Sequence, residues 1–231
     1  GGAIANSGTF NAGTGTVSFT GSGSISTGDI SFNHVEINGE VSFGSNSTVN
    51  GTLQLNPGGS VRNNPPIYGS NSILKYSTGN VYNRSDEWKP NTDEGPGFPN
   101  IVQIYKSGTY TSTLSENKSV NEELYCRGII TDEACSYEMT ELSEKPLIVN
   151  GDVIINGTFS FSSQAGGDLK VSDDFIKGEN GSIDWGDNNG RAVFFTGTST
   201  YTQTVSGISS IPFILQTGNG NLQLNNDLNI T

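Results

Sequence analysis

A short string that recurs four times constrains the fold more than any other feature of this 231-residue chain. The string reads apolar, Asn, Gly, polar, apolar, and it begins at Ile37, Val49, Val149 and Ile155. Alternation of period two predicts a strand with one buried face. The Asn-Gly pair supplies residues that tolerate a positive φ, which lets the chain turn between strands. The template therefore predicts many short strands separated by tight corners.

Two all-β folds are compatible with this template. Asn-Gly between apolar runs is also the strongest hairpin signal, so a β-sandwich or meander is the alternative. The template recurs after 12 residues between Ile37 and Val49 and after 6 between Val149 and Ile155, which leaves room only for very short strands. Stacked coils bury an inner row with few apolar residues per turn, which suits a chain that is 32% hydrophobic. We therefore predict a right-handed parallel β-helix, a β-solenoid with an irregular loop insertion.

The asparagines of the template occupy equivalent places in the string. If the strings stack as coils, these side chains form a ladder that satisfies backbone groups at one corner, a structural role that needs no ligand. The predicted ladder consists of Asn38, Asn50, Asn150 and Asn156.

Composition divides the chain into three parts. We expect solenoid coils over 1–79, a loop-rich insertion on or within the solenoid over 80–146, and further coils over 147–231. Prolines at 90, 96 and 99 argue against a central strand near them, and a strand resumes at Ile101. An echo between 15–21 and 191–197, offset by 176 residues, predicts that the last part continues into a next repeat. We expect a piece of a longer array, with neighbouring repeats of the same chain as partners.

The net charge narrows the classes of partner that this chain can bind. The 11 Lys and Arg against 23 Asp and Glu give a formal charge of −12, the opposite of what nucleic acid or an anionic membrane requires. No apolar run approaches the roughly 18 residues of a transmembrane helix.

Cys126 and Cys135 lie nine residues apart in a turn-rich segment. An even count at close spacing predicts a disulfide in an oxidising compartment, with two buried free thiols as the alternative.

Low-complexity motifs occur at 6–11, 16–23, 82–88, 97–104 and 166–171. These strings resemble the repetitive regions of large Bacteroidota cell-surface proteins, and the resemblance spans most of the chain. Many of those proteins resemble adhesins or gliding-motility proteins exported by the type IX secretion route. The resemblance implies a β-helix that is secreted or exposed at the cell surface, as a rigid stalk or contact module of an adhesin. The C-terminal signal of that route has no counterpart in the sequence.

Catalysis is not expected. His34, the only histidine, sits beside a predicted strand, where an exposed or hydrogen-bonded strand histidine is the simplest interpretation. We predict no catalytic residues, no enzyme activity and no obligatory cofactor.

The 80–105 loop suggests an alternative function. Aromatic rings with nearby acids are typical of sugar-binding sites, and parallel β-helices also host polysaccharide-active enzymes. A glycan-binding or polysaccharide-active module would expose the tryptophan in a groove, whereas a structural loop would bury it. The candidate ligand residues are Tyr82, Asp86, Glu87, Trp88 and Phe98.

Calcium is the most plausible ion, because carboxylate, amide and carbonyl oxygens abound. The Gly-rich turn with Asp184, Asp187 and Asn188 has suitable ligands, although its spacing is not that of an EF-hand. The pairs 132–133 and 173–174 are further candidates, and Asp/Asn-rich turns held by their own hydrogen bonds are the alternative.

Overall fold

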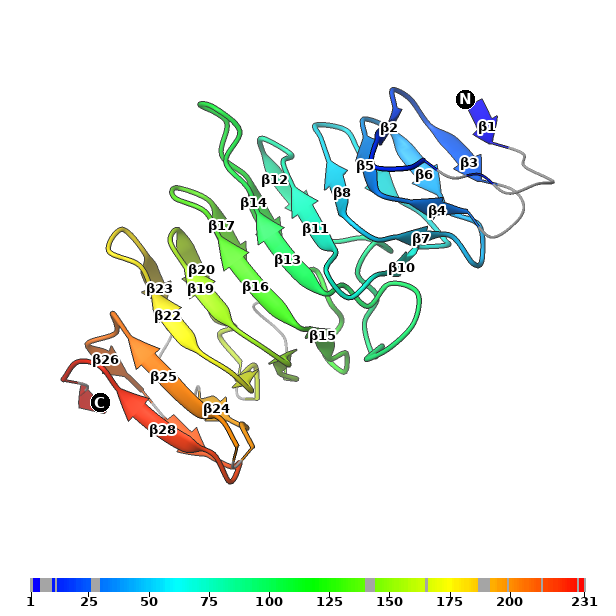
Figure 1. The fold of residues 1–231 in the computed structure, drawn as a ribbon. Coiled ribbons are helices and arrows are strands. Elements are labelled where there is room, and N and C mark those ends of the chain that lie inside the picture. The colour runs from blue at the N-terminus through cyan, green and yellow to red at the C-terminus, as the bar shows by residue number, and fades with distance from the viewer. Residues whose placement is uncertain are drawn as a thin grey trace.

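The structure, a computed structural model, describes residues 2–4, 10, 12–25, 30–139, 144–164, 166–186, 192–198, 200–212, 214–227 and 229–230. Every element in these ranges is a strand, and the strands stack as successive coils from the N-terminal to the C-terminal end (Figure 1). The described part of the chain is thus an all-β solenoid of about nine turns without a helix.

One ten-stranded sheet runs along the solenoid and gives each coil one strand. Its strands, in order, are β2 (Thr16–Phe19), β5 (His34–Ile37), β8 (Thr52–Leu55), β11 (Ile73–Tyr76), β13 (Ile101–Ile104), β16 (Gly128–Thr131), β19 (Val153–Ile155), β22 (Phe175–Lys177), β25 (Thr202–Ser206) and β28 (Asn221–Leu224).

The other faces of the coils are built from shorter sheets. Near the N-terminal end these are β1 (Gly2–Ile4), β3 (Gly23–Ile25), β6 (Glu40–Ser42) and β9 (Ser60–Val61), and β4 (Ser31–Phe32), β7 (Thr48–Val49) and β10 (Ile67–Tyr68). The following coils carry β12 (Val81–Asn83), β14 (Thr113–Ser115), β17 (Ser136–Glu138), β20 (Thr158–Ser160) and β23 (Ser182–Asp184), and β15 (Leu124–Cys126), β18 (Leu147–Val149), β21 (Leu169–Val171), β24 (Val193–Phe195) and β27 (Ile214–Gln216). A last pair joins β26 (Ser210–Ile211) to β29 (Asn229–Ile230).

The pairing of the strands decides between the two predicted folds. Along the ten-stranded sheet every described pair is parallel, for example Ile73 beside Ile101 and Val153 beside Phe175. A meander or an antiparallel sandwich requires the opposite pairing. The predicted parallel β-helix is confirmed, and its right-handed sense stays a prediction.

The core is a set of columns that run along the solenoid axis. The column behind the ten-stranded sheet contains buried, mostly aliphatic side chains that stack in register: Val35, Leu53, Leu74, Val102, Ile129, Val153, Phe175 and Val205. Burying each large side chain stabilises the fold by roughly 1.5–3 kcal/mol. Each coil therefore needs only a few inward apolar residues, as the modest hydrophobic fraction predicted.

The template glycines serve a different purpose from the one predicted. None of Gly39, Gly51, Gly151 and Gly157 is among the residues with a positive φ. Instead their Cα atoms lie against the backbone of the preceding coil. A Cβ on Gly151 would lie 1.7 Å from the carbonyl oxygen of Arg127, and one on Gly157 would lie 2.1 Å from that of Cys135. The template requires glycine because the coils approach closely, and not because the chain reverses there.

The four asparagines do not form one ladder, which corrects the prediction. Asn38 and Asn156 follow strands of the ten-stranded sheet, whereas Asn50 and Asn150 follow β7 and β18 in two other sheets. The neighbour of Asn38 in the next coil is Asn56, whose amide donates to the Ile37 carbonyl, as the Asn38 amide does to that of Phe19. The same string occurs at different corners of the coil. Residues at the same place in the string therefore do not lie in one spatial column.

Two of the asparagines share a local arrangement. The Asn50 Oδ1 and Asn156 Oδ1 atoms lie 2.7 and 2.4 Å from the Cβ position of a glycine in the following coil, Gly69 and Gly178. An asparagine corner in one coil is thus paired with a glycine corner in the next.

The segment 80–146 is part of the solenoid. Six of its strands, β12 to β17, pair with their neighbours in the stacked sheets, and β13 begins at Ile101 as predicted. Between Arg84 and Asn100 the chain forms a loop without a strand, in agreement with its prolines. The 176-residue echo has no structural counterpart, because Val17 lies in the ten-stranded sheet and Val193 lies in the sheet of β15 and β24.

The predicted disulfide is wrong. Cys126 and Cys135 are both buried free thiols. They lie on either side of β16, whose four extended residues span about 10 Å. The alternative interpretation, two buried free thiols, describes this structure.

Candidate functional site

The loop from Arg84 to Asn100 contains most of the residues predicted to bind a ligand. Backbone contacts fix it to the solenoid, since the Gly97 amide donates to the Pro66 carbonyl at 3.0 Å and Pro96 forms an isolated bridge with Ile67. Within the loop the Lys89 amide donates to the Gly97 carbonyl at 2.9 Å. The loop is therefore a tied excursion of one coil.

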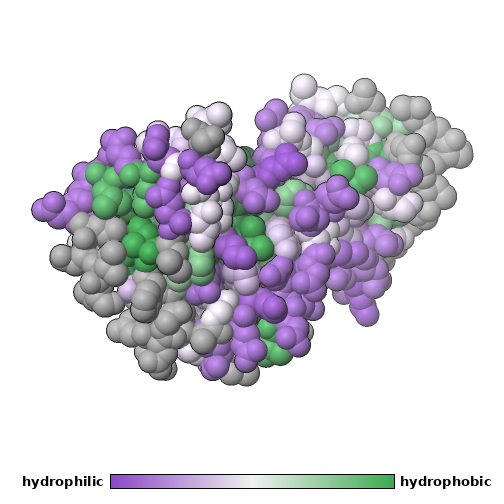
Figure 2. Space-filling model, turned by 90° about the horizontal axis from the view of Figure 1, so that it is seen from below, coloured by the Kyte–Doolittle hydropathy of each residue, from purple (hydrophilic) through white to green (hydrophobic). Residues whose placement is uncertain are grey.

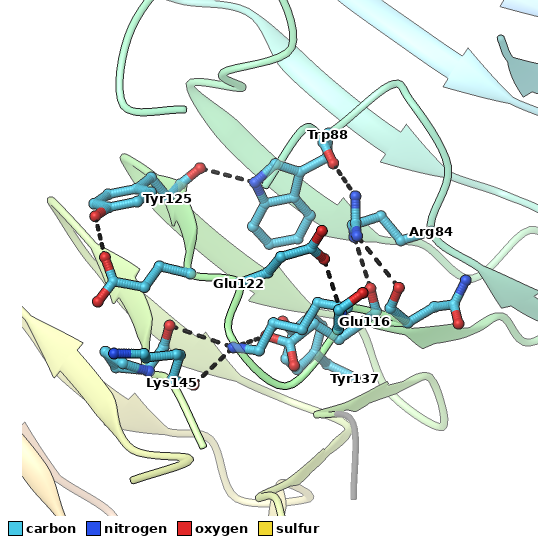
Figure 3. Close-up of polar contacts among 12 residues, drawn as sticks. Arg84, Trp88, Glu116, Glu122, Tyr125, Tyr137 and Lys145 are labelled. Carbon is cyan, nitrogen blue, oxygen red and sulfur yellow. Dashed lines mark hydrogen bonds and ion pairs between the residues drawn. The ribbon is translucent and has the colours of Figure 1, made fainter. Parts of the chain in front are cut away.

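Trp88 is not available to a ligand. Its side chain is 0% exposed, and its Nε1 donates to the Tyr125 carbonyl at 2.8 Å (Figure 3). Its ring lies 6.3 Å from that of Tyr137 inside the coil. The groove exposing Trp88 that a sugar platform needs is absent, and the ring instead anchors the loop to the neighbouring coil.

Glu87 is equally buried, at 0% exposure. Its carboxylate accepts hydrogen bonds from the Ser85 amide at 2.8 Å and from the hydroxyls of Tyr76 and Tyr82, each at 3.2 Å. Burial raises the pKa of Glu87 above its usual value, while these donors act in the opposite direction. The structure thus brings Tyr82 and Glu87 together, but as a satisfied interior pair.

The other two candidates of this set lie apart from that pair. Asp86 accepts a hydrogen bond from the Asn63 amide at 2.6 Å and caps a neighbouring corner. Phe98 is 7% exposed, with the Arg127 guanidinium carbon 5.6 Å from its ring centroid. Phe98 also borders a surface hollow.

Arg84 organises the interior side of the loop. Its guanidinium donates to the carbonyl oxygens of Glu116 at 2.6 Å and of Ser85 and Asn117 at 3.3 Å, and also to that of Trp88. A guanidinium offers five donors in a fixed fork, so one side chain can hold several carbonyl groups. Arg84 thereby joins two loop segments that are about 32 residues apart in the sequence.

A buried ion pair lies beside it. Lys118 and Glu116 have fully buried side chains, with Nζ 3.1 Å from Oε1. Lys118 also donates to the carbonyls of Lys145 and Pro146, at 2.8 and 3.3 Å, and the Tyr137 hydroxyl donates to Glu116 at 3.1 Å. Desolvation lowers the pKa of Lys118, an effect that the Glu116 carboxylate opposes.

Sequence reasoning did not find this cluster of Arg84, Glu87, Glu116 and Lys118, which we term the inner charge cluster. The sequence feature that could have revealed this cluster was a set of isolated charged residues near tyrosines, in a chain in which only 15% of residues are charged. Its two cations and two carboxylates are buried and are held by backbone carbonyls and tyrosine hydroxyls. The arrangement joins loop segments to one another and to the coils.

The calcium prediction falls largely outside the described residues. Asp187 and Asn188 lie there, and the Oδ1 of Asp184 accepts a hydrogen bond from the Gly186 amide at 3.0 Å. Among the residues that can be described, no group of three or more His, Cys, Asp or Glu side chains is placed to hold a metal.

The two alternative acidic pairs make protein contacts. Asp132 accepts from Gln103 at 3.0 Å and Asp174 from the Thr204 amide at 2.7 Å. Glu133 accepts from Asn180 at 2.8 Å, and Asp173 accepts from Ser172 at 3.3 Å. Calcium binding by this chain stays a prediction.

His34 lies in β5, where its Nδ1 accepts a hydrogen bond from the Thr52 amide of the next coil at 3.1 Å. The predicted role of a hydrogen-bonded strand histidine is confirmed. The residue acts as a link between coils.

The surface is mainly polar. One face of the molecule shows many hydrophilic residues, with apolar residues in separate patches between them (Figure 2). Isolated apolar residues are normal on soluble proteins, so no single large patch marks a partner on this face.

A scan against protein-family models, a search of curated proteins and a search of solved structures found no match to this chain. The described residues contain no helix long and apolar enough to cross a membrane.

Proposed function

We propose that this chain is a non-catalytic segment of a large secreted or cell-surface adhesin, in which it acts as a rigid stalk or contact module. The observation that carries the proposal is the ten-stranded parallel sheet that joins the coils without interruption. With neighbouring strands about 4.8 Å apart, ten strands span roughly 43 Å.

Rigidity follows from the way that coils are joined. Consecutive coils share backbone ladders on more than one face and a continuous core column, so bending opens hydrogen bonds and apolar contacts together. A module whose contacts lie between neighbouring coils suits a spacer that presents other parts of a protein at a distance.

The surface location rests on the resemblance to Bacteroidota surface proteins and on charge. A chain with a formal charge of −12 resists non-specific association with nucleic acid and anionic lipid. Its partners in this proposal are the neighbouring coils of a longer chain and an extracellular ligand.

Surface proteolysis tests the location. Intact cells of the source organism are treated with protease, and the chain is followed with an antibody raised against residues 1–231. We expect the antibody to bind unbroken cells and the signal to disappear after protease treatment, while a cytoplasmic control enzyme survives. A chain that is protected until the cells are lysed would overturn the proposal.

Removal of one coil tests the stalk. Val153 pairs with Phe175, so deleting residues 153–174 removes 22 residues and leaves Asp152 next to Phe175, where Asp174 stands in the native chain. We expect a folded protein, shortened by one coil, with β-rich circular dichroism. Deleting residues 153–163 alone breaks the register and should prevent folding. If both deletions behave alike, the coils are not independent spacers.

A further inference from the structure

One surface hollow has the chemistry of a ligand site. It has a volume of about 270 Å³ and lies between the end of β10, the outer part of the 84–100 loop and Arg127 of the next coil. This volume is just below the roughly 300–1,000 Å³ typical of pockets for drug-sized ligands. The size suits a small molecule or one unit of a polymer.

The walls of the hollow are held by backbone contacts. The Phe98 amide donates to the Gly95 carbonyl at 3.3 Å, and the Arg127 amide donates to the Asn100 carbonyl at 2.9 Å. On the opposite wall the Tyr68 hydroxyl donates to the Glu87 carbonyl at 2.8 Å. The loop and both coils are therefore in place before a ligand arrives, which lowers the entropic cost of binding.

The lining combines aromatic and polar residues. Tyr68 and Phe98 supply aromatic side chains, and Glu94, Asn100 and Arg127 supply a carboxylate, an amide and a guanidinium, which we term the polar rim. Arg127 and Glu94 are exposed, so their groups are free of the desolvation cost that buried charges carry. An arginine lying over an aromatic ring can still donate from its N–H groups.

Sugars fit this combination. Each hydroxyl of a sugar both donates and accepts, which suits a rim that offers a carboxylate, an amide and a guanidinium. The C–H face of a sugar ring packs on apolar and aromatic surface. The rim has one carboxylate and one guanidinium, and the whole chain is strongly acidic, so an acidic sugar would be repelled.

We propose that this hollow binds a neutral sugar, as a monosaccharide or as the terminal unit of a neutral glycan. The inference deepens the contact role of the proposed function and rests on it for its setting. It assigns the ligand to Tyr68, Phe98, Asn100 and Arg127, and not to the buried Trp88 and Glu87. The purified chain is sufficient for the test, so the surface location and the sugar site can fail separately.

Ligand-observed NMR with methyl glycosides of glucose, galactose, mannose and N-acetylglucosamine tests the proposal on the purified 231-residue chain. We expect at least one of these glycosides to show saturation transfer, and glucuronic acid to show none. Binding of glucuronic acid alone, or of no glycoside at millimolar concentration, would overturn the proposal.

Variants locate the binding. Arg127→Ala and Asn100→Ala each remove a rim donor and should weaken the best glycoside about tenfold or more, because hydrogen bonds to charged or polar groups carry that much affinity. Arg62→Ala, which removes an exposed arginine elsewhere, is the matched control and should bind as the unchanged protein does. Circular dichroism and thermal unfolding confirm that all three variants fold. Unchanged affinity in both rim variants places the sugar elsewhere and refutes the site.

Discussion

The coils near 153–184 and those near 76–137 have the same backbone ladders outside and different interiors. In the first region an aromatic row fills the coil, with the Phe159 and Phe161 rings 5.1 Å apart and Trp185 stacked on Phe161 at 4.8 Å. In the second region the inner charge cluster lies beside Trp88 and four tyrosines. The same parallel strand pairing therefore accommodates either an aromatic interior or a charged one, provided that the spacing between coils is kept.

The two interiors differ in what they tolerate. An apolar column loses stability in proportion to the contacts removed, because each side chain makes many weak ones. A buried polar network depends on every member, since each donor removed leaves acceptors without water or partner. The coils that contain the inner charge cluster also carry the long loops. Its charged side chains hold loop segments that lie beyond the contacts of an apolar core column.

The largest expected effect comes from the inner charge cluster. Replacing Arg84 by Met keeps most of the volume but removes the donors to four carbonyl groups and the positive charge beside Glu87. We expect the free energy of unfolding to fall by about 3–5 kcal/mol, the range seen when one partner of a buried ionic contact is removed. Chemical denaturation of the purified variant measures the change.

Arg62→Met is the matched control for that variant. Arg62 forms a salt bridge with Glu40 at 3.1 Å, but its side chain is 64% exposed. Exposed pairs contribute about 0–1 kcal/mol, so this variant should be nearly unchanged. If the two arginines cost the same, the polar interior does not differ from the surface and the contrast between the regions disappears.

A smaller loss of stability should follow when alanine replaces a glycine at the contact between two coils. Gly151→Ala places a Cβ 1.7 Å from the Arg127 carbonyl oxygen, so the backbone of one coil must move. Gly128→Ala meets its nearest atom at 3.6 Å, an ordinary contact. We expect a loss of about 1–3 kcal/mol or more for Gly151→Ala, and a near-neutral result for Gly128→Ala. Equal thermal midpoints would show that glycine is not needed for close approach.

These pairs of regions also show how far sequence reasoning reached. Period-two alternation and short spacing predicted the solenoid, because stacking in register rewards that pattern locally. The same local view placed Asn38, Asn50, Asn150 and Asn156 in one column, although the corner that each string occupies depends on the length of every coil before it. A structural loop that buries Trp88 was one of the two interpretations that the sequence allowed. The burial of Glu87 was beyond sequence reasoning, since its partner Tyr76 lies on another strand.

The contribution of Glu87 to the free energy of unfolding should depend modestly on pH, and the aromatic interior of the other region should make no such contribution. Because burial raises the pKa of Glu87 in the folded state, folded protein binds a proton more readily there than unfolded protein does. Stability from this group is therefore present at low pH and is lost as pH rises from the unfolded pKa through the folded one. We expect the stability of Glu87→Gln relative to the unchanged protein to improve as pH rises above about 4, the unfolded pKa of Glu, as followed by denaturant titration. A difference that does not vary with pH would mean that Glu87 titrates normally.

The last prediction is that a reductant has no effect on stability. It concerns the two buried thiols, which lie within the region of the inner charge cluster. Burial raises the pKa of both Cys126 and Cys135, so the reactive thiolate is scarce in the folded protein. A reductant should leave the thermal midpoint unchanged. A thiol reagent should label neither cysteine rapidly until denaturant is added, and should then label both. A midpoint that falls with reductant, together with two missing thiols after denaturation, would mean that the pair is joined, and the assignment of two buried free thiols would have to be abandoned.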